Sequence, residues 1–392
     1  MTDSPIRVLL WSPRGSGEHY NGPASFTYRL YSSAPEGKIE VTLAHGWSEQ
    51  EAFPIFHDQR FISDYGQQPW QLTRFIRRGT RWLDDNIEKF DVMHGINAFH
   101  GTVLPAAHAQ RSGLPAVVFV ANHQTQLADK RGLKGLLKLP KKRRKLIKEL
   151  AGMIAMSQAI YEELLGYGVP EEKIARIPMG VNTQVFRPVA SKIERKEIRS
   201  EFGWLDLPTV LFVGGIVRRK RPDLLIEAVG LLKRRGLECQ VAIVGPDHDP
   251  EYTTQMKDRA EELRVAELIV WFGFTPDISR VYRAADFFCL PSSNEGMAAA
   301  LIEAMACGLP AIVTPVSGSV DAVEDGELGQ IVQPESPIIA DALAEYILNP
   351  EIANKHGKAA RQRVVDNFSN EYVFTEYEQL FRRIMMGGNA AE

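Results

Sequence analysis

Residues 291–310 read PSSNEGMAAALIEAMACGLP, and they follow an apolar run over Asp286–Leu290. The run is typical of a buried strand, and the small residues from about Met297 onward favour a helix. Gly308 predicts the end of this helix, and Pro310 begins the next strand. A loop between a strand and a helix presents backbone N–H groups and the positive end of the helix dipole, where anions bind. The stretch therefore predicts a parallel α/β domain with an anion site at the edge of its sheet.

Short apolar runs and helical segments alternate along the whole 392-residue chain. The runs that predict strands in the first half are Ile6–Trp11, Ile39–His45, Asp91–Gly95, Ala116–Ala121 and Met153–Met156. Those in the second half are Thr209–Val213, Gln240–Val244, Leu268–Phe272, Asp286–Leu290 and Ala311–Val313. Such runs, separated by helices, are typical of parallel sheets. The sequence therefore predicts an α/β protein with two doubly wound, Rossmann-like domains that face a central cleft.

The alternating pattern breaks in residues 178–195, which hold two prolines, one glycine and no clear period. We interpret this segment as a linker. The first domain is then expected over residues 1–185 and the second over residues 186–367. Residues 368–392 predict a C-terminal helix, which we expect to cross back to the first domain.

Composition excludes several classes of protein. Lys and Arg number 46 against 49 Asp and Glu, so the net charge is −3 and a nucleic-acid partner is disfavoured. The three cysteines (Cys239, Cys289 and Cys307) form no CxxC pair, which argues against a disulfide framework or a zinc site and favours a reducing compartment. No apolar run approaches the roughly 20 residues of a membrane span, and the N-terminus has no signal-peptide pattern. We therefore expect a cytoplasmic protein.

Two glutamates stand out within the 291–310 stretch. Glu303 lies among apolar residues, where a carboxylate needs a partner. Sugar hydroxyls could supply one, at roughly 1.5–3 kcal/mol per charged hydrogen bond. Glu295 is eight residues earlier, and on a helix that spacing of 100° per residue leaves the two side chains about 80° apart. The alternative is that Glu303 is a solvated helix residue and Glu295 an N-terminal capping acid.

This block resembles the signature of the retaining glycosyltransferases of family 4, which have the GT-B fold and read E-G-F-x-x-x-x-x-E-A-M-A-C-G-x-P. The matching positions are Glu295, Gly296, Glu303, Ala304, Met305, Ala306, Cys307, Gly308 and Pro310. The resemblance implies that Glu303 binds the ribose hydroxyls of a sugar nucleotide and that Glu295 touches the transferred sugar. It also implies that N–H groups after Gly296, at Met297 and Ala298, hold sugar hydroxyls and the diphosphate.

A second segment, residues 211–221, reads LFVGGIVRRKR and opens a predicted helix after a strand. Its glycines and basic residues suit a diphosphate. The family reads V-G-R-x-x-x-x-K-G here, and its Arg and Lys neutralise the leaving diphosphate. Lys220 matches the Lys, whereas Gly215 stands in place of the Arg, so Arg219 or Arg218 would supply the second charge. The alternative is a solvated basic helix start, which the helix dipole disfavours.

The first domain carries weaker matches. The glycine-rich loop over Pro13–Pro23, with Gly17 and Gly22, resembles the family loop near the diphosphate and the acceptor. It is not a GxGxxG motif, so a dinucleotide site is not expected. His123 ends a predicted strand and matches the family histidine that binds the donor sugar, although a capping role is the alternative. His94 is expected to be structural or near the acceptor.

Three other segments complete the resemblance. Residues 174–188 match the family hinge, with Met179 and Asn182 as departures. Phe274 follows a predicted strand at the place where the family contacts the base through backbone groups. The acidic pair in residues 247–249 resembles a DxD metal motif of a different fold, so we interpret it as a surface loop and expect no metal or other cofactor.

Two basic segments of the first domain have no role toward the donor. Residues 131–148 contain no acid and nine basic residues: Arg131, Lys134, Lys138, Lys141, Lys142, Arg143, Arg144, Lys145 and Lys148. The second segment carries the stripe Arg74, Arg77, Arg78 and Arg81. Basic amphipathic helices suit an anionic membrane surface, which predicts a peripheral enzyme on the inner face of the cytoplasmic membrane. The alternatives are a solvated face, an anionic soluble acceptor or RNA.

Together these features predict a retaining, metal-independent hexosyltransferase. We expect a nucleoside diphosphate sugar, with UDP favoured, as donor and a hydroxyl of a lipid-linked or glycan acceptor in cell-envelope biosynthesis. The expected catalytic residues are Glu295, His123, Lys220 and Arg219. A GDP-mannose-dependent mannosyltransferase is one alternative, and a catalytically silent scaffold at the membrane is another, because Gly215 replaces the family Arg.

Overall fold

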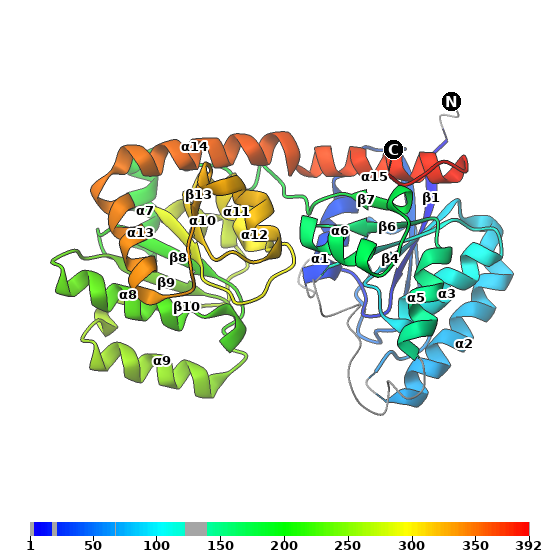
Figure 1. The fold of residues 1–392 in the computed structure, drawn as a ribbon, viewed down its shortest axis with the longest axis horizontal. Helices are drawn as coiled ribbons and strands as arrows, with labels where there is room; N and C mark the ends of the chain where they lie inside the picture. Colours follow the sequence, from blue (N-terminus) through cyan, green and yellow to red (C-terminus); the bar gives the residue numbers. More distant parts are fainter. Residues whose placement is uncertain (1–3, 18–21, 67, 122–138, 392) are drawn as a thin grey trace. The chain divides into compact units, whose positions relative to one another are not determined.

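The computed structural model describes residues 4–17, 22–66, 68–121 and 139–391, and for residues 139–142 and 325 it describes the backbone only. The chain divides into two compact units (Figure 1). Unit 1 comprises Met1–Gly180 and Asn370–Glu392, and unit 2 comprises Val181–Ser369. The boundaries lie within a few residues of those expected from the sequence.

Unit 1 is built on a seven-stranded sheet of order β3-β2-β1-β4-β5-β6-β7, in which every pairing is parallel. Its strands are β1 (Ile6–Ser12), β2 (Ile39–His45), β3 (Asp58–Phe61), β4 (Val92–Ile96), β5 (Ala116–Val120), β6 (Gly152–Ala155) and β7 (Ile174–Arg176). Its helices are α1 (Gly22–Ser32), α2 (Pro69–Asn86), α3 (His100–Arg111), α5 (Leu139–Glu149), α6 (Gln158–Gly166) and α15 (Asn370–Met385). The strand order reverses between β1 and β4, as in doubly wound folds.

Unit 2 repeats this plan with six parallel strands in the order β10-β9-β8-β11-β12-β13. The strands are β8 (Thr209–Val213), β9 (Gln240–Val244), β10 (Ile269–Gly273), β11 (Phe287–Leu290), β12 (Ala311–Val313) and β13 (Gly329–Ile331). The helices are α7 (Lys192–Phe202), α8 (Asp223–Arg234), α9 (Pro250–Glu262), α10 (Ile278–Ala284), α11 (Ala299–Ala306), α12 (Ser317–Val323), α13 (Ser336–Leu348) and α14 (Pro350–Asn367). The order reverses between β8 and β11.

The central strands are buried on both faces, which explains their near-continuous apolar sequences. In β5 all five residues, AVVFV, are buried, and the same is true of QVAIV in β9. The predicted strands are therefore confirmed within one or two residues. The edge strands β3, β7 and β13 escaped prediction because they are only three or four residues long, and β3 is also largely exposed, so they carry little apolar signal.

The C-terminal helix α15 belongs to unit 1, where it packs beside α1 (Figure 1). Tyr377 lies with its ring centroid 5.2 Å from that of His94 and 6.3 Å from that of Phe26. His94 is fully buried, and its Nδ1 is 2.7 Å from the Tyr31 hydroxyl. Burial lowers the pKa of His94 to about 3, so the ring is neutral and belongs to the core.

Candidate functional site

The most chemically distinctive place in unit 2 lies where the strand order of its sheet reverses. Strands β8 and β11 are parallel neighbours there, with Val210 opposite Phe287 and Leu211 opposite Phe288. In doubly wound sheets, ligands bind outside the carboxyl ends of the strands, at the point where the strand order reverses. The segment with Lys220 follows β8, and the segment with Glu295 follows β11.

Backbone bonds fasten the neighbouring loops at this edge. The N–H of Gly214 donates to Val244 O (2.9 Å), and the N–H of Gly245 donates to Gly273 O (2.8 Å). Gly245 has φ of +139°, and a Cβ there would overlap the carbonyl oxygen of Gly214. Only glycine allows this close approach, so the backbones at the ends of β8, β9 and β10 pack directly against one another.

Two basic side chains converge on one carboxylate at this edge. Glu295 Oε1 lies 2.9 Å from Lys220 Nζ and 3.0 Å from Arg219 Nη1, and it accepts a hydrogen bond from Ser292 Oγ at 2.9 Å. The Glu295 and Lys220 side chains are only 10% and 15% exposed, whereas that of Arg219 is 47% exposed. Arg219 Nη1 also donates to the carbonyl of Asn294, which fixes the guanidinium beside the loop. The three charged groups carry a net charge of +1.

The charge state of Glu295 follows from this arrangement. Burial alone raises the pKa of the carboxyl, but the charges of Lys220 and Arg219 and the hydrogen bonds from Lys220 and Ser292 outweigh it. The pKa of Glu295 therefore lies below its ordinary value, and the carboxylate is ionised at neutral pH. A buried, ionised carboxylate beside two cations, open on the side of Arg219, suits a ligand with both an anionic and a polar, uncharged part.

The other predicted glutamate, Glu303, lies on α11 and is buried, with 8% of its surface exposed. Its Oε2 accepts a hydrogen bond from the hydroxyl of Tyr282 (2.9 Å), a fully buried residue of α10. Tyr282 carries no signal in the sequence that would indicate this role. Helix α11 begins only at Ala299, so Glu295 lies in the loop before it, and the expected 80° helical spacing between the glutamates is wrong.

The loop between Glu295 and α11 is fixed by a backbone contact with α12. The carbonyl of Gly296 accepts a hydrogen bond from Gly318 N–H (2.6 Å), and a Cβ on Gly318 would overlap that carbonyl. Met297 and Ala298 are buried, and Ala298 begins α11 without a side-chain cap. The first N–H groups of the helix are therefore not satisfied by a side chain of the capping residue. Phe274, at the end of β10, is 67% exposed on the same sheet edge.

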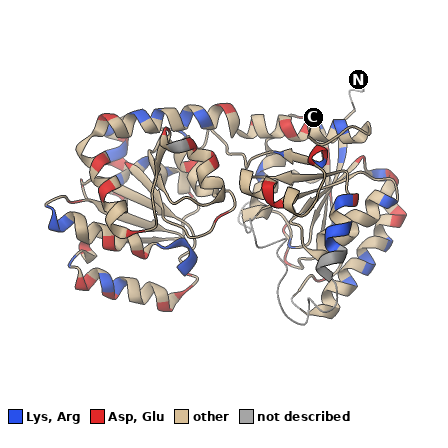
Figure 2. Cartoon of the chain, viewed as in Figure 1, with Lys and Arg blue, Asp and Glu red and all other residues tan. Residues whose placement is uncertain are grey.

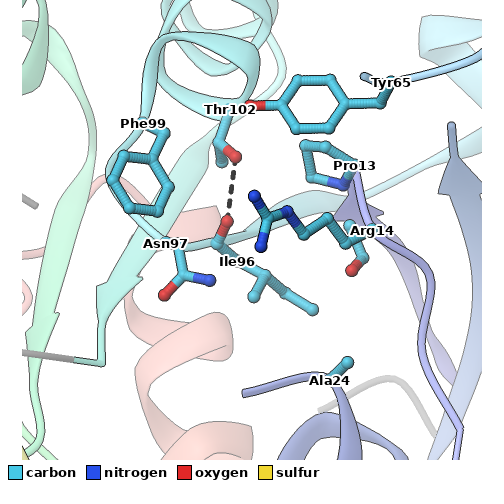
Figure 3. Close-up of a pocket in the computed structure, with 9 residues that line it drawn as sticks. Pro13, Arg14, Ala24, Tyr65, Ile96, Asn97, Phe99 and Thr102 are labelled. Atoms are coloured by element: carbon cyan, nitrogen blue, oxygen red, sulfur yellow. Dashed lines mark hydrogen bonds between the residues drawn. The ribbon is translucent and has the colours of Figure 1, made fainter. Parts of the chain in front are cut away.

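Unit 1 has a pocket at the corresponding place, where its strand order reverses (Figure 3). Arg14 follows β1 and Asn97 follows β4, and both line the pocket with Phe99, Tyr65 and Thr102. Thr102 Oγ1 donates to Ile96 O (2.8 Å), which fixes the start of α3 beneath it (Figure 3).

The glycine-rich loop of unit 1 leads out of this pocket. Gly17 is buried, and Gly22 is the exposed first residue of α1. The residues between them lie outside the part of the chain that the structure describes, and so does the predicted catalytic residue His123.

Two family profiles match the chain, one over each half. Glycosyl transferases group 1 matches residues 194–363, and Glycosyltransferase Family 4 matches residues 20–185. The chain belongs to glycosyltransferase family 4.

Several relatives of this family 4 chain have names that state an enzymatic activity. It is 30% identical over 209 residues to the GDP-mannose-dependent alpha-(1-6)-phosphatidylinositol monomannoside mannosyltransferase of Mycolicibacterium smegmatis, with 51% of this chain and 53% of the relative covered. It is 26% identical over 243 residues to the alpha-D-kanosaminyltransferase of Streptomyces kanamyceticus, with 62% of each covered. The chain thus spans between half and two thirds of the length of these relatives.

Solved structures with the GT-B fold resemble the chain over nearly its whole length. HepE of Anabaena in complex with UDP has a TM-score of 0.78 at 15% identity, covering 95% of this chain and 98% of that one. WaaG, a glycosyltransferase involved in lipopolysaccharide biosynthesis, has a TM-score of 0.73 at 18% identity, covering 97% and 100%. These likenesses establish the fold.

The side chain of His248 lies against Gly215, where this family 4 chain departs from the family Arg. A Cβ on Gly215 would lie 2.6 Å from Cδ2 of His248, so the imidazole occupies the place where a side chain would begin. The neighbouring arginines divide: Arg219 reaches Glu295, whereas Arg218 turns to α9. There Arg218 contacts Asp249 (3.4 Å) and lies 4.9 Å from the centre of the Tyr252 ring.

The acidic pair around His248 serves the start of α9. Asp247 Oδ1 accepts from Thr253 Oγ1 (2.8 Å), and Asp249 Oδ1 caps the helix by accepting from Tyr252 N–H (3.1 Å). Among the residues that the structure describes, no three His, Cys, Asp or Glu side chains gather as a metal site would need. The sequence does not indicate that His248 lies at this site, because only the tertiary structure brings it against Gly215.

The basic residues of the predicted patch divide between exposed and buried positions. Arg77 and Arg78 are exposed on α2, on one stripe with Arg74 and Arg81. On α5 the expected exposure of Arg143 is wrong, because it is buried with 8% exposed, and Arg144 stacks over the Tyr167 ring at 4.3 Å. Lys138 lies outside the described residues, as do the side chains of Lys141 and Lys142. No described helix is long and apolar enough to cross a membrane.

Proposed function

We propose that this family 4 protein transfers a hexose from a nucleoside diphosphate sugar to a hydroxyl group of an acceptor, with retention of the anomeric configuration and without a metal ion. The observation that carries the proposal is the buried, ionised Glu295 bound by Lys220 and Arg219 at the reversal point of the sheet. The names of two relatives, a mannosyltransferase and a kanosaminyltransferase, support the class of reaction, which is transfer of a sugar.

Departure of the diphosphate is the step for which the charges are suited. Negative charge develops on the leaving oxygen, and preorganised cations in a partly buried site stabilise it far better than water does. Lys220 and Arg219 supply two positive charges there, and only one is balanced by Glu295. In this proposal they take the place of the divalent cation that other transferases use, so turnover is expected to persist in EDTA.

Glu295 is proposed to face the sugar as positive charge develops on its ring. Its carboxylate is held by Lys220, Arg219 and Ser292, so it is oriented before the substrate arrives. We assign it a role in positioning and electrostatic stabilisation rather than as a covalent nucleophile. The family resemblance adds His123 as a second contact to the donor sugar. Attack from the same face as departure then retains the configuration.

Glu303 is proposed to bind the ribose hydroxyls of the donor. The Tyr282 hydroxyl holds one of its oxygens, which orients the carboxylate on the buried face of α11. Phe274 on the same sheet edge is proposed to flank the base. UDP is the favoured nucleotide, in line with the UDP bound to HepE, and GDP is the alternative, in line with the mannosyltransferase relative.

The acceptor is proposed to be a lipid-linked or glycan hydroxyl reached at an anionic membrane surface. Arg74, Arg77, Arg78 and Arg81 recur every three or four residues, so they share one face of α2, where Figure 2 shows basic bands. Within the described ranges none of the four forms an ion pair with an acid, and Trp70 beside them is 60% exposed. Their mutual repulsion costs the helix stability unless an anionic partner offsets it.

The test is release of nucleoside diphosphate from a panel of UDP-, GDP- and ADP-sugars, with and without membrane lipid extract. Release from one donor is expected, and NMR of the product should show the anomer of the donor. Glu303→Gln keeps the acceptor for Tyr282 but loses the charge, and it should raise KM for the donor at least tenfold. Glu197→Gln, an exposed position on α7, is the matched control. No release from any donor in either condition would favour the scaffold.

A further inference from the structure

A second concave surface of unit 1 has no role in the proposed donor chemistry. It is a groove of about 820 Å³ formed by the ends of β2 and β3 and the loop between them. Its lining residues are His45, Trp47, Ser48, Gln50, Ala52, Phe53, Pro54, Phe56, His57, Asp58, Gln59 and Phe61. The volume falls within the range of small-molecule sites.

Two aromatic rings of this groove are left open to solvent. Trp47 is 41% exposed and Phe61 is 44% exposed, although large aromatic side chains are normally covered. Phe56, by contrast, is buried. Exposed aromatic surface that lines a hollow and is rimmed by polar residues is typical of a ligand site rather than of ordinary surface.

Polar groups of defined character lie beside these rings. His45 Nδ1 lies 3.1 Å from the carbonyl oxygen of Trp47, so this nitrogen carries the proton and donates it. Burial lowers the pKa of His45 to about 4, so the ring is neutral and its Nε2 is a hydrogen-bond acceptor. Asp58 is exposed and accepts a hydrogen bond from Gln59 N–H (2.8 Å), which leaves further acceptor capacity on the carboxylate.

The groove is continuous with the glycine-rich loop at the end of β1. Gly46 N–H donates to Pro13 O (3.1 Å), Ser16 N–H donates to Gln50 Oε1 (3.0 Å), and Gln50 Nε2 donates back to Ser16 O (2.9 Å). All these segments follow the carboxyl ends of parallel strands. The groove therefore lies at the sheet edge where doubly wound domains bind ligands.

We propose that this groove binds a pyranose ring of a glycan acceptor, stacked on Trp47 and Phe61, with hydroxyls donating to His45 Nε2 and Asp58. A pyranose has one face of C–H groups, which pack on aromatic rings, and a rim of hydroxyls, which donate hydrogen bonds. The inference rests on the proposed function, because it names the class of acceptor.

The same chemistry disfavours other occupants. An acyl chain would cover the carboxylate of Asp58 and the free lone pair of His45 without giving either a hydrogen bond, which costs free energy. A phosphate would meet the negative charge of Asp58, and no Lys or Arg is among the described residues that line the groove. Only a ligand with both apolar faces and hydroxyl donors satisfies all of these groups.

The experiment is saturation-transfer NMR on the full chain with methyl glycosides and disaccharides of glucose, galactose, mannose and N-acetylglucosamine. Saturation is expected on the ring C–H protons of at least one glycoside. Trp47→Ala and Phe61→Leu should weaken its binding at least fivefold, whereas Trp47→Phe and Phe61→Tyr, which keep an aromatic face, should stay within twofold. Leu348→Ala, at an exposed apolar residue of α13 in unit 2, is the control for nonspecific effects.

Two results would overturn the inference: no glycoside receives saturation, or the groove variants bind glycosides as the unmodified chain does. The release of nucleoside diphosphate, measured on the same preparations, reports on the donor site separately. Donor turnover without glycoside binding would refute the groove alone. Glycoside binding that depends on the two aromatic residues, without donor turnover, would refute the proposed function and leave the groove as a sugar site.

Discussion

The carboxyl edges of the two sheets share a topology but differ in chemistry. In unit 2 the edge carries Lys220 and Arg219 against a buried Glu295, over loops fastened by close glycine contacts. In unit 1 the edge carries open aromatic rings, Trp47 and Phe61, beside neutral His45. In both units the site lies at the carboxyl edge of a parallel sheet, whereas the side chains decide which ligand suits it. A charged edge suits a diphosphate, and an aromatic edge suits a sugar ring.

The charged edge is tested most severely by Lys220→Ala. The variant removes a cation at the place where negative charge is proposed to develop, so donor turnover should fall about 10²–10³-fold. Lys196→Ala removes an exposed lysine, paired with Asp206 on the surface of unit 2, and is the matched control. The measurement is nucleoside diphosphate release under saturating donor. A loss of less than tenfold would mean that this edge does not act on the diphosphate.

The close backbone contact between Gly245 and Gly214 at the charged edge is tested by Gly245→Ala. At φ of +139° and against the carbonyl of Gly214, the added Cβ forces the loops apart, so unfolding free energy should drop by about 2–4 kcal/mol. Gly166→Ala, at the end of α6 in unit 1, meets nothing within 4 Å and should change stability by less than about 1 kcal/mol. Urea unfolding measures both. Equal effects would contradict the close approach.

The two units also bury titratable groups in opposite states, which gives a test by pH. His94 in unit 1 is neutral with a pKa of about 3, below its ordinary 6.5, so the unfolded chain binds the extra proton. Its contribution is complete above about pH 6.5 and is lost at up to roughly 1.4 kcal/mol per unit as the pH falls toward 3. Urea unfolding between pH 6.5 and 4.5 should show this slope. His94→Gln should reduce the slope by nearly one proton, and an unchanged slope would refute the assignment.

The arginine stripe of α2 gives the smallest expected effect. Each basic residue near anionic headgroups contributes about 1 kcal/mol, so Arg77→Ala should weaken binding to vesicles of 30% phosphatidylglycerol about fivefold. Arg235→Ala, which removes an exposed arginine paired with Asp341 in unit 2, should leave binding unchanged. Sedimentation with anionic and with neutral vesicles measures both. Binding that ignores anionic lipid would show that the stripe serves a different anionic partner.

The sequence predicted strands and helices correctly where they leave a continuous or periodic apolar pattern. The buried central strands follow from continuous apolar runs, and α15 begins within two residues of the C-terminal helix expected from residue 368. The same patterns did not predict the edge strands of the two sheets. Strand β3 reads DQRF, and half-exposed edge strands of this length have no periodic signal. Because β3 was missed, the groove beside it could not be inferred either.

The candidate site divides in the same way. The block around Glu295 and Glu303 was identified from sequence because a strand, a glycine loop and a small-residue helix are local features. The charge state of Glu295 depends instead on Lys220, which is 75 residues away along the chain. The choice of Arg219 over Arg218 depends on which side chain faces the carboxylate once the loops are folded.

The sequence by itself determined two doubly wound units, their boundaries to within a few residues, and the family to which they belong, because buried parallel strands and glycine turns leave local signatures. Only the tertiary structure decided that Glu295 is ionised between two cations, that His248 fills the space above Gly215, and that aromatic rings line the ends of β2 and β3. These features arise where loops from different strands meet, and the distances between such loops are set by the packing of whole sheets rather than by neighbouring residues.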